Sequence, residues 1–203
     1  MNPPFALVLA AGASRRFGSP KALALFRGRS LLELAVERVR LVVGDRFAVV
    51  IGADADALIP ALALAPHQII RHDAWREGQS SSLRAGLAKA PSDSAGLLIT
   101  LLDQPLVTAK ELRQLIEVWS AAPDHPAAAE YAEGQLGAPC VLPRHWFAAI
   151  NQLQGDRGAN VLLRACKDVS RVPMPSAAHD IDTPDDLARL SLLDVDIRGA
   201  LRS

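Results

Sequence analysis

The chain has 203 residues, of which 50% are hydrophobic and 22% are charged, a composition typical of a globular protein rather than a disordered one. Its 22 basic and 22 acidic residues cancel to a formal net charge of zero, which argues against bulk electrostatic attraction to nucleic acid or to a membrane. Anion binding must then depend on local clusters of charge.

Cysteine usage and hydropathy indicate the compartment. Cys140 and Cys166 form neither a C-x-x-C pair nor a zinc-spaced cluster, so we expect two buried, reduced thiols. The first residues lack the basic segment of a signal peptide, and no apolar run reaches the roughly 20 residues needed to span a bilayer. We expect a cytoplasmic protein with one domain over residues 1–190 and a C-terminal tail over 191–203, binding neither nucleic acid nor membrane.

The first predicted strand, Leu7–Leu9, is a continuous apolar run of the kind buried on both faces of a parallel sheet. A loop of small residues follows, where backbone N–H groups can approach a ligand closely. These small residues are Ala10, Ala11, Gly12, Ala13 and Ser14, with Gly18 further on.

The same loop is strongly basic, because Arg15, Arg16 and Lys21 fall within seven residues. Three cations at this spacing match a triphosphate, although a basic surface turn after a core strand explains them too. Neither the G-x-G-x-x-G nor the G-x-x-x-x-G-K-[ST] phosphate loop is present.

Strand and helix patterns then alternate. Ser30 can cap a helix with Glu33 at the capping-box position, Phe47–Gly52 reads as a second strand, and Asp54 can cap a helix through Leu62. A shorter third strand is expected at 67–71. This alternation predicts an α/β fold with a doubly wound, mostly parallel sheet.

Small hydroxyl residues precede the helical pattern that ends at Leu87. One interpretation is that Ser80–Ser82 cap that helix. The other is that the side chains of Gln79 and Ser80, with the helix N-terminal amides, contact a ligand at the carboxyl edge of the sheet.

The apolar run Gly96–Val107 is the strongest candidate for a buried strand, and Asp103 stands near its end. Strand ends in open α/β sheets are where ligands bind, and a carboxylate there is a hard oxygen ligand suited to Mg²⁺. Alternatively, Asp103 organises the turn or caps the helix that begins near Thr108.

The second half of the chain adds a small antiparallel excursion near 126–142, or a β-rich flap, around a turn at Gly134. Gly137 and Pro139 suit a tight turn within it. Gly155, Asp156 and Gly158 precede a later helix. One interpretation is that they form a second anion or substrate site, and the other is that they only cap this helix.

The last predicted elements are a strand and a helix. An edge strand is expected at 169–174. Thr183 can cap a final helix, with Asp182 directly before it.

The stretch from Leu7 to Lys21 resembles the signature L-A-A/G-G-x-S-x-R-M-G-x-x-K of nucleotidyltransferases, with Phe17 in place of Met. It is most similar to the molybdenum cofactor cytidylyltransferases. The resemblance to these enzymes covers this chain from Ala6 to about Leu190. The resemblance implies a Rossmann-like nucleotidyltransferase fold with Mg²⁺ held by Asp103 and Asp182. It implies catalytic roles for Arg15, Lys21 and Asp103. Nucleotide contacts would come from Ala10, Ala11, Gly12, Ser14, Arg15, Arg16, Lys21, Gln79 and Ser80, and substrate contacts from Gly137, Pro139, Asp156 and Gly158.

The expected reaction is transfer of CMP from CTP to a phosphate-bearing acceptor, with molybdopterin cofactor preferred, and release of pyrophosphate. A phosphate nucleophile is already anionic near neutral pH, so this reaction needs charge neutralisation more than proton removal. A molybdoenzyme is a possible partner. One alternative is a non-catalytic chaperone for molybdenum cofactor, and another is a nicotinamide-dependent oxidoreductase.

Overall fold

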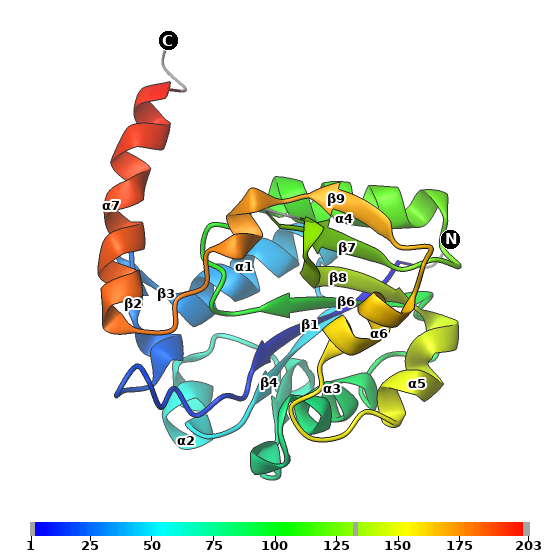
Figure 1. Cartoon of the computed structure of the whole chain (residues 1–203). Helices are drawn as coiled ribbons and strands as arrows, with labels where there is room; N and C mark the ends of the chain where they lie inside the picture. Colours follow the sequence, from blue (N-terminus) through cyan, green and yellow to red (C-terminus); the bar gives the residue numbers. More distant parts are fainter. Residues whose placement is uncertain (1–2, 132–133, 201–203) are drawn as a thin grey trace.

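Residues 3–131 and 134–200 are described in the computed structural model of the chain, with side chains described as far as residue 193. A seven-stranded sheet in the order β5-β4-β1-β6-β8-β7-β9 forms its centre, with helices on both faces (Figure 1). The strands are β1 (Phe5–Ala10), β4 (Phe47–Ile51), β5 (Ile69–Arg71), β6 (Gly96–Leu101), β7 (Ala127–Glu130), β8 (Leu136–Pro143) and β9 (Ser170–Pro173).

Only β8, among the described strands of this sheet, runs against its neighbours, because it pairs antiparallel with both β6 and β7. The predicted doubly wound, mostly parallel sheet is therefore confirmed. The antiparallel segments expected near 126–142 are β7 and β8, and both belong to the main sheet rather than to a separate flap. A second, two-stranded sheet joins β2 (Leu25–Phe26) to β3 (Arg29–Ser30).

The sheet is covered on both faces, which explains the uninterrupted apolar run in β1. Ala6, Val8 and Ala10 pack on one side with α1 (Leu31–Val43), α2 (Ala55–Leu58) and α4 (Ala109–Ala121). Phe5, Leu7 and Leu9 pack on the other side with α3 (Gln79–Leu87), α5 (Phe147–Asn151) and α6 (Ala159–Ala165). Successive strand residues point to opposite faces, so a strand buried on both sides needs apolar residues at every position.

Helix starts follow local sequence signals. Ser30 Oγ accepts from the Glu33 amide, and the Glu33 carboxylate accepts from the Ser30 amide, which confirms the predicted capping box. Thr108 and Glu111 form the same arrangement at α4. At α7 (Pro184–Ala200), Thr183 Oγ1 accepts from the Asp186 amide, so Thr183 caps this helix as expected.

Several expected boundaries are wrong. Asp54 makes no side-chain cap bond to α2, which ends at Leu58 and gives way to a 3₁₀ turn at Ile59–Ala61. Pro60 explains this break, because proline lacks the N–H that an α-helix requires. β6 ends at Leu101 rather than Val107, and β5 begins only after a 3₁₀ turn at Pro66–Gln68.

The last helix crosses the expected boundary between the domain and its C-terminal tail. α7 runs without a break across residue 190, and Figure 1 shows it projecting away from the sheet. The last part of the expected tail, residues 201–203, lies outside the described residues. Within the described ranges, no helix has the length and apolar character needed to cross a bilayer.

The connections of β1 and β6 create the place where a ligand can bind. The chain leaves β1 for β4 on one side, passes to β5, and then returns across the sheet to β6 on the other side of β1. The loops that follow β1 and β6 therefore start side by side at the carboxyl edge. Such a switch in strand order leaves a crevice in an open α/β sheet.

Candidate active site

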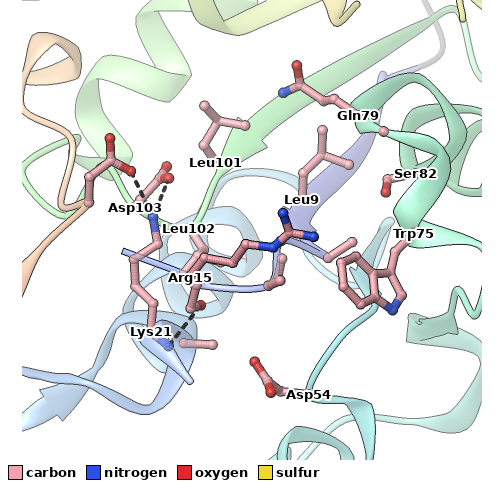
Figure 2. A pocket seen from close by; sticks show the side chains of 18 of the residues that line it. Leu9, Arg15, Lys21, Asp54, Trp75, Gln79, Ser82, Leu101, Leu102 and Asp103 are labelled. Carbon is pink, nitrogen blue, oxygen red and sulfur yellow. Dashed lines mark hydrogen bonds and ion pairs between the residues drawn. The ribbon is translucent and has the colours of Figure 1, made fainter. Parts of the chain in front are cut away.

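A cavity of about 560 Å³ occupies this crevice. It is lined by the loop after β1, the end of β6, the residues after β4, the start of α3 and two carboxylates from later in the chain. The close-up in Figure 2 shows Arg15 extending across it between Asp103 and Lys21 on one side and Trp75 on the other. The cavity thus has a charged end and a wall of mixed polarity.

The basic loop is closed by Ser14. Ser14 adopts a positive φ of 49°, its carbonyl accepts from the amides of Phe17 and Gly18, and its hydroxyl accepts from the Lys21 amide at 3.1 Å. These bonds fold the chain back so that Lys21 lies beneath the loop. Ala10, Ala11, Gly12, Ser14, Arg15 and Arg16 line the cavity together with Lys21.

Lys21 joins the two carboxylates expected to converge. Its ammonium lies 2.8 Å from Asp103 Oδ2 and 3.4 Å from Asp182 Oδ1, and only 11% of its side chain is exposed. Arg16 reaches Asp182 from the solvent side at 2.9 Å. The backbone adds a further tie, because the Ile181 amide donates to the Asp103 carbonyl at 2.8 Å. Asp103 and Asp182 thus both contact Lys21, and that they share one metal ion stays a prediction.

Capping does not explain either carboxylate. Thr108 caps α4, so Asp103 is not its cap, and Thr183 with Asp186 caps α7 without the Asp182 side chain. Asp103 Oδ1 is buried and has no hydrogen-bond partner among the described residues. An orphaned buried carboxylate oxygen beside a second carboxylate fits a cation.

A metal here would depend on the substrate for its other ligands. Within the described ranges no group of three or more His, Cys, Asp and Glu side chains is arranged to hold a metal ion. Mg²⁺ in nucleotide sites typically takes one or two carboxylates and completes its shell with phosphate oxygens and water. The pair Asp103 and Asp182 fits that pattern.

Asp180 adds negative charge to this end of the cavity. Partial enclosure of its carboxyl group, followed by repulsion from Asp103 and then from Asp182, raises the pKa of Asp180 to about 6. Near neutral pH it is therefore mostly ionised, although the charge is held unfavourably. A hydrogen bond from Gln104 and, less strongly, the charge of Lys21 oppose this rise in the pKa.

The opposite wall is formed by α3 and the turn before it. Gln79 and Ser82 line the cavity, whereas Ser80 is fully buried and its hydroxyl accepts from Arg84 at 3.3 Å. Ser82 rather than Ser80 therefore lines the cavity, and the nucleotide contact expected from Ser80 stays a prediction. α3 begins at Gln79, with Gly78 as its N-cap, so the interpretation in which the serines cap the helix is wrong. The i,i+3 spacing of Gln79 and Ser82 was the missed signal, since such residues share a helix face.

Glycines hold the loop at 155–158 against this wall. A side chain on Gly78, whose φ is +97°, would clash with the Gly155 backbone, and one on Gly158 would clash with Gln79 Oε1. The Ser80 amide donates to the Gly155 carbonyl at 3.0 Å. Asp156 consequently reaches the cavity, but Gly158 serves the packing of Gln79 rather than lining the space.

Gly137 and Pro139, predicted as substrate contacts, lie apart from the cavity lining. A side chain on Gly137 would come within 2.5 Å of the Tyr131 hydroxyl, which packs over it. Its glycine therefore has a packing explanation. Trp75 and Asp54, which the sequence analysis did not assign to the site, both line the cavity. Trp75 packs so closely on Gly52 that a side chain there would clash with it.

Comparison with known proteins identifies the family. Residues 6–171 match the family model described as the MobA-like NTP transferase domain. The chain belongs to this family. The match spans the basic loop, Asp103 and the strands that carry them, and it makes the protein a nucleotidyltransferase, as expected from the sequence.

Individual relatives of this MobA-like domain have diverse names. Nicotine blue oxidoreductase from Paenarthrobacter nicotinovorans is 33% identical over 197 residues, covering 91% of this chain and 94% of that protein. A probable molybdenum cofactor guanylyltransferase from a Geobacillus strain is 55% identical over 49 residues, or 24% of this chain and 25% of that protein.

Among solved structures, Rv0371c from Mycobacterium tuberculosis is 31% identical with a TM-score of 0.81, covering 94% of this chain and 98% of that one. A manganese complex of Rv0371c superposes with a TM-score of 0.76 at 29% identity, covering 91% and 96% of the two chains.

Proposed function

We propose that this MobA-like nucleotidyltransferase transfers CMP from CTP to a phosphate-bearing acceptor, with molybdopterin cofactor as that acceptor, and releases pyrophosphate. The observation that carries the proposal is the meeting of Lys21 with Asp103 and Asp182 beneath a basic loop at one end of the cavity. Cations and a paired carboxylate site in one place suit a reaction at a triphosphate.

Arg15 and Lys21 act on the charge of the triphosphate. Arg15 extends into the cavity, and Lys21 lies below the same loop, so both can neutralise negative charge that builds up on the leaving pyrophosphate (Figure 2). Loop amides after Ala11 can approach the phosphates closely because the neighbouring side chains are small. No histidine is among the described residues that line the cavity, which suits an acceptor phosphate that is already ionised.

Asp103 and Asp182 would hold Mg²⁺, and the partnerless Asp103 Oδ1 supports that assignment. When bound, such an ion neutralises phosphate charge and aligns the reacting groups. With Asp103 and Asp182 holding an ion, the Lys21 ammonium would be available to neutralise the charge of the triphosphate. The same residue thus balances the carboxylates before binding and the phosphates after it.

Donor and acceptor are assigned to different parts of the cavity. The Ala10-Ala11-Gly12 form of the loop resembles cytidylyl-transferring enzymes, and Trp75, Gln79 and Ser82 offer a partly apolar wall for the nucleoside. Asp156 is the predicted acceptor contact that reaches the cavity. The local similarity to a molybdenum cofactor guanylyltransferase supports a molybdopterin acceptor, whose product would pass to a molybdoenzyme.

A second candidate is a nicotinamide-dependent oxidoreductase. The specific observation in its favour is the similarity to nicotine blue oxidoreductase over 91% of this chain. Against it stands the chain's lack of a G-x-G-x-x-G loop. The charged end of the cavity also has no evident use in hydride transfer.

One experiment separates the two candidates. The protein is incubated with Mg²⁺, molybdopterin cofactor and each of CTP, GTP, ATP and UTP in turn, and pyrophosphate release is measured together with the mass of the product. Parallel reactions follow the oxidation of NADH and NADPH with nicotine blue as acceptor. We expect pyrophosphate and a cytidylylated product with CTP.

Asp103→Asn serves as the matched negative control, because it keeps the shape of the side chain and removes its charge. Pyrophosphate release that depends on acceptor and is lost in Asp103→Asn supports the proposal. Oxidation of a nicotinamide cofactor without pyrophosphate release from any nucleotide would refute it in favour of the second candidate.

A further inference from the structure

The residue after Asp103 is turned away from the cavity and into the protein. Gln104 is only 2% exposed, yet it carries a polar amide. Its Nε2 donates to the Ala177 carbonyl at 2.8 Å, to the Ala138 carbonyl at 3.0 Å and to the Tyr131 hydroxyl at 3.3 Å. These acceptors come from three separate segments, so one side chain connects the turn after β6 to all of them.

The connection to Ala177 bears on the position of Asp182. Ala177 lies shortly before Asp182 in the chain. Between these two residues, the Ile181 amide donates to the Asp103 carbonyl at 2.8 Å. The segment that carries Asp182 is therefore tied to the Asp103–Gln104 turn at two points, one through the backbone and one through the Gln104 amide. Asp103 and Asp182 lie 79 positions apart in the sequence, and these two bonds join the segments that carry them.

Arg38 also holds the turn that contains Gln104. From α1, its Nη1 donates to the Gln104 carbonyl at 2.6 Å and to the Val107 carbonyl at 2.8 Å. The turn is thereby fixed between α1 and the segment at 177–181. With its backbone held by Arg38, the Gln104 side chain can transmit that position to the loop of Asp182.

The side-chain amide of Gln104 is oriented so that its NH₂ group faces the carbonyls of Ala138 and Ala177. Its Oε1 is buried and has no hydrogen-bond partner among the described residues. The reverse orientation would set this oxygen against the carbonyl oxygens of Ala138 and Ala177, which only the NH₂ group can satisfy. A buried acceptor without a partner costs stability, so the residue is not optimised for stability alone.

We propose that Gln104 is a positioning residue that sets the spacing of Asp103 and Asp182 by bracing the 177–182 segment. Its effect on metal binding and turnover rests on the function proposed above, whereas the brace itself does not. Residues that orient metal ligands commonly change metal affinity or activity about 10–100-fold when replaced.

The test compares Gln104→Met with Thr100→Val. Methionine keeps the length of glutamine and removes both N–H donors. Thr100→Val removes a buried hydrogen bond from the same part of the chain, donated by Thr100 Oγ1 to the Leu7 carbonyl at 3.2 Å, but one that does not involve the segment of Asp182. Thr100→Val therefore controls for general destabilisation. Gln104→Asn, which keeps the amide on a shorter side chain, is the second variant if Gln104→Met folds poorly.

The first readout is amide hydrogen exchange at Ile181 in protein without metal or nucleotide. We expect exchange at least about tenfold faster in Gln104→Met than in Thr100→Val at matched stability, because the 177–182 segment opens locally. This result is independent of the enzyme's substrate. Equal exchange at Ile181 in the two variants would overturn the brace.

The second readout is Mn²⁺ affinity by titration, followed by the separate effects on kcat and KM. We expect Mn²⁺ binding about 10–100-fold weaker in Gln104→Met and a lower kcat with little change in the KM for CTP, whereas Thr100→Val stays near wild type. Faster exchange at Ile181 with unchanged Mn²⁺ affinity would overturn the role in positioning the carboxylates. If wild type released no pyrophosphate at all, the proposed function would fail while the exchange result still decided the brace.

Discussion

Replacing Lys21 with Met should change metal binding and turnover in opposite directions. In the protein without ligand, the Lys21 ammonium lies 2.8 Å from Asp103 and 3.4 Å from Asp182, in the position where a metal would have to take both carboxylates. Removing it leaves the two carboxylates facing each other. A divalent cation should then bind more tightly in the absence of nucleotide.

The size of this effect follows from the burial of the ion pair. A hydrogen bond to a charged group contributes about 1.5–3 kcal/mol, and Lys21 is enclosed enough, with 11% of its side chain exposed, to belong in that range. Since about 1.4 kcal/mol corresponds to a factor of ten, Lys21→Met should bind Mn²⁺ about 10–100-fold more tightly. Its kcat should fall about 10²–10³-fold, the usual loss when one preorganised charge partner of the transition state is removed.

Arg16→Met is the matched control. Arg16 also pairs with Asp182, at 2.9 Å, but 72% of its side chain is exposed and it does not reach Asp103. Exposed ion pairs contribute only about 0.2–1 kcal/mol, so this variant should change Mn²⁺ affinity less than about fivefold. Mn²⁺ affinity is measured by electron paramagnetic resonance titration without nucleotide. Weaker or unchanged Mn²⁺ binding in Lys21→Met would show that the lysine does not compete with a metal.

Three further predictions concern other groups. Asp103→Asn and Asp182→Asn should each reduce pyrophosphate release severely. In a double-mutant cycle, the double variant should lose much less activity than the sum of the two single losses, because both carboxylates serve one site; full additivity would separate their roles. Cys140→Ala should retain turnover, since burial raises the pKa of the Cys140 thiol to about 12 and leaves no thiolate for chemistry; loss of turnover in a folded variant would contradict this. Burial lowers the pKa of His72 below its usual 6.5, so the stability contributed by neutral His72 is present above pH 6.5 and is lost as the pH falls through the lowered pKa. The melting temperature of wild type should therefore exceed that of His72→Gln by less as the pH falls over that range. A difference in melting temperature that stays constant with pH would refute the assignment.

The sequence by itself determined the features that depend on near neighbours. The apolar run Leu7–Leu9 required burial on both faces, and the parallel sheet that supplies it was predictable from the alternation of strands and helices. The cap at Ser30 depends on a residue only three positions away, so it too was readable. The basic loop carried its own signature, which indicated a nucleotidyltransferase before any contact was known.

Local patterns failed where a single position changes the direction of a side chain. The sequence left Ser80–Ser82 as helix caps or Gln79 and Ser80 as ligand contacts. Because α3 starts at Gln79, Ser80 is buried and Ser82 lines the cavity instead. Successive residues of a helix point in directions about 100° apart, so an error of one or two residues in a helix start exchanges buried and exposed positions.

Only the tertiary structure decided which distant groups meet. Lys21 contacts Asp182 across 161 positions, and Gln104 reaches Ala177 across 73. Trp75 and Asp54 join the site because β4, β5 and β1 are neighbours in the sheet, an order that no local pattern encodes. Hydrogen bonds between near neighbours are specified by their spacing in the chain, whereas contacts across the sheet exist only once the strand order has brought their loops to one edge.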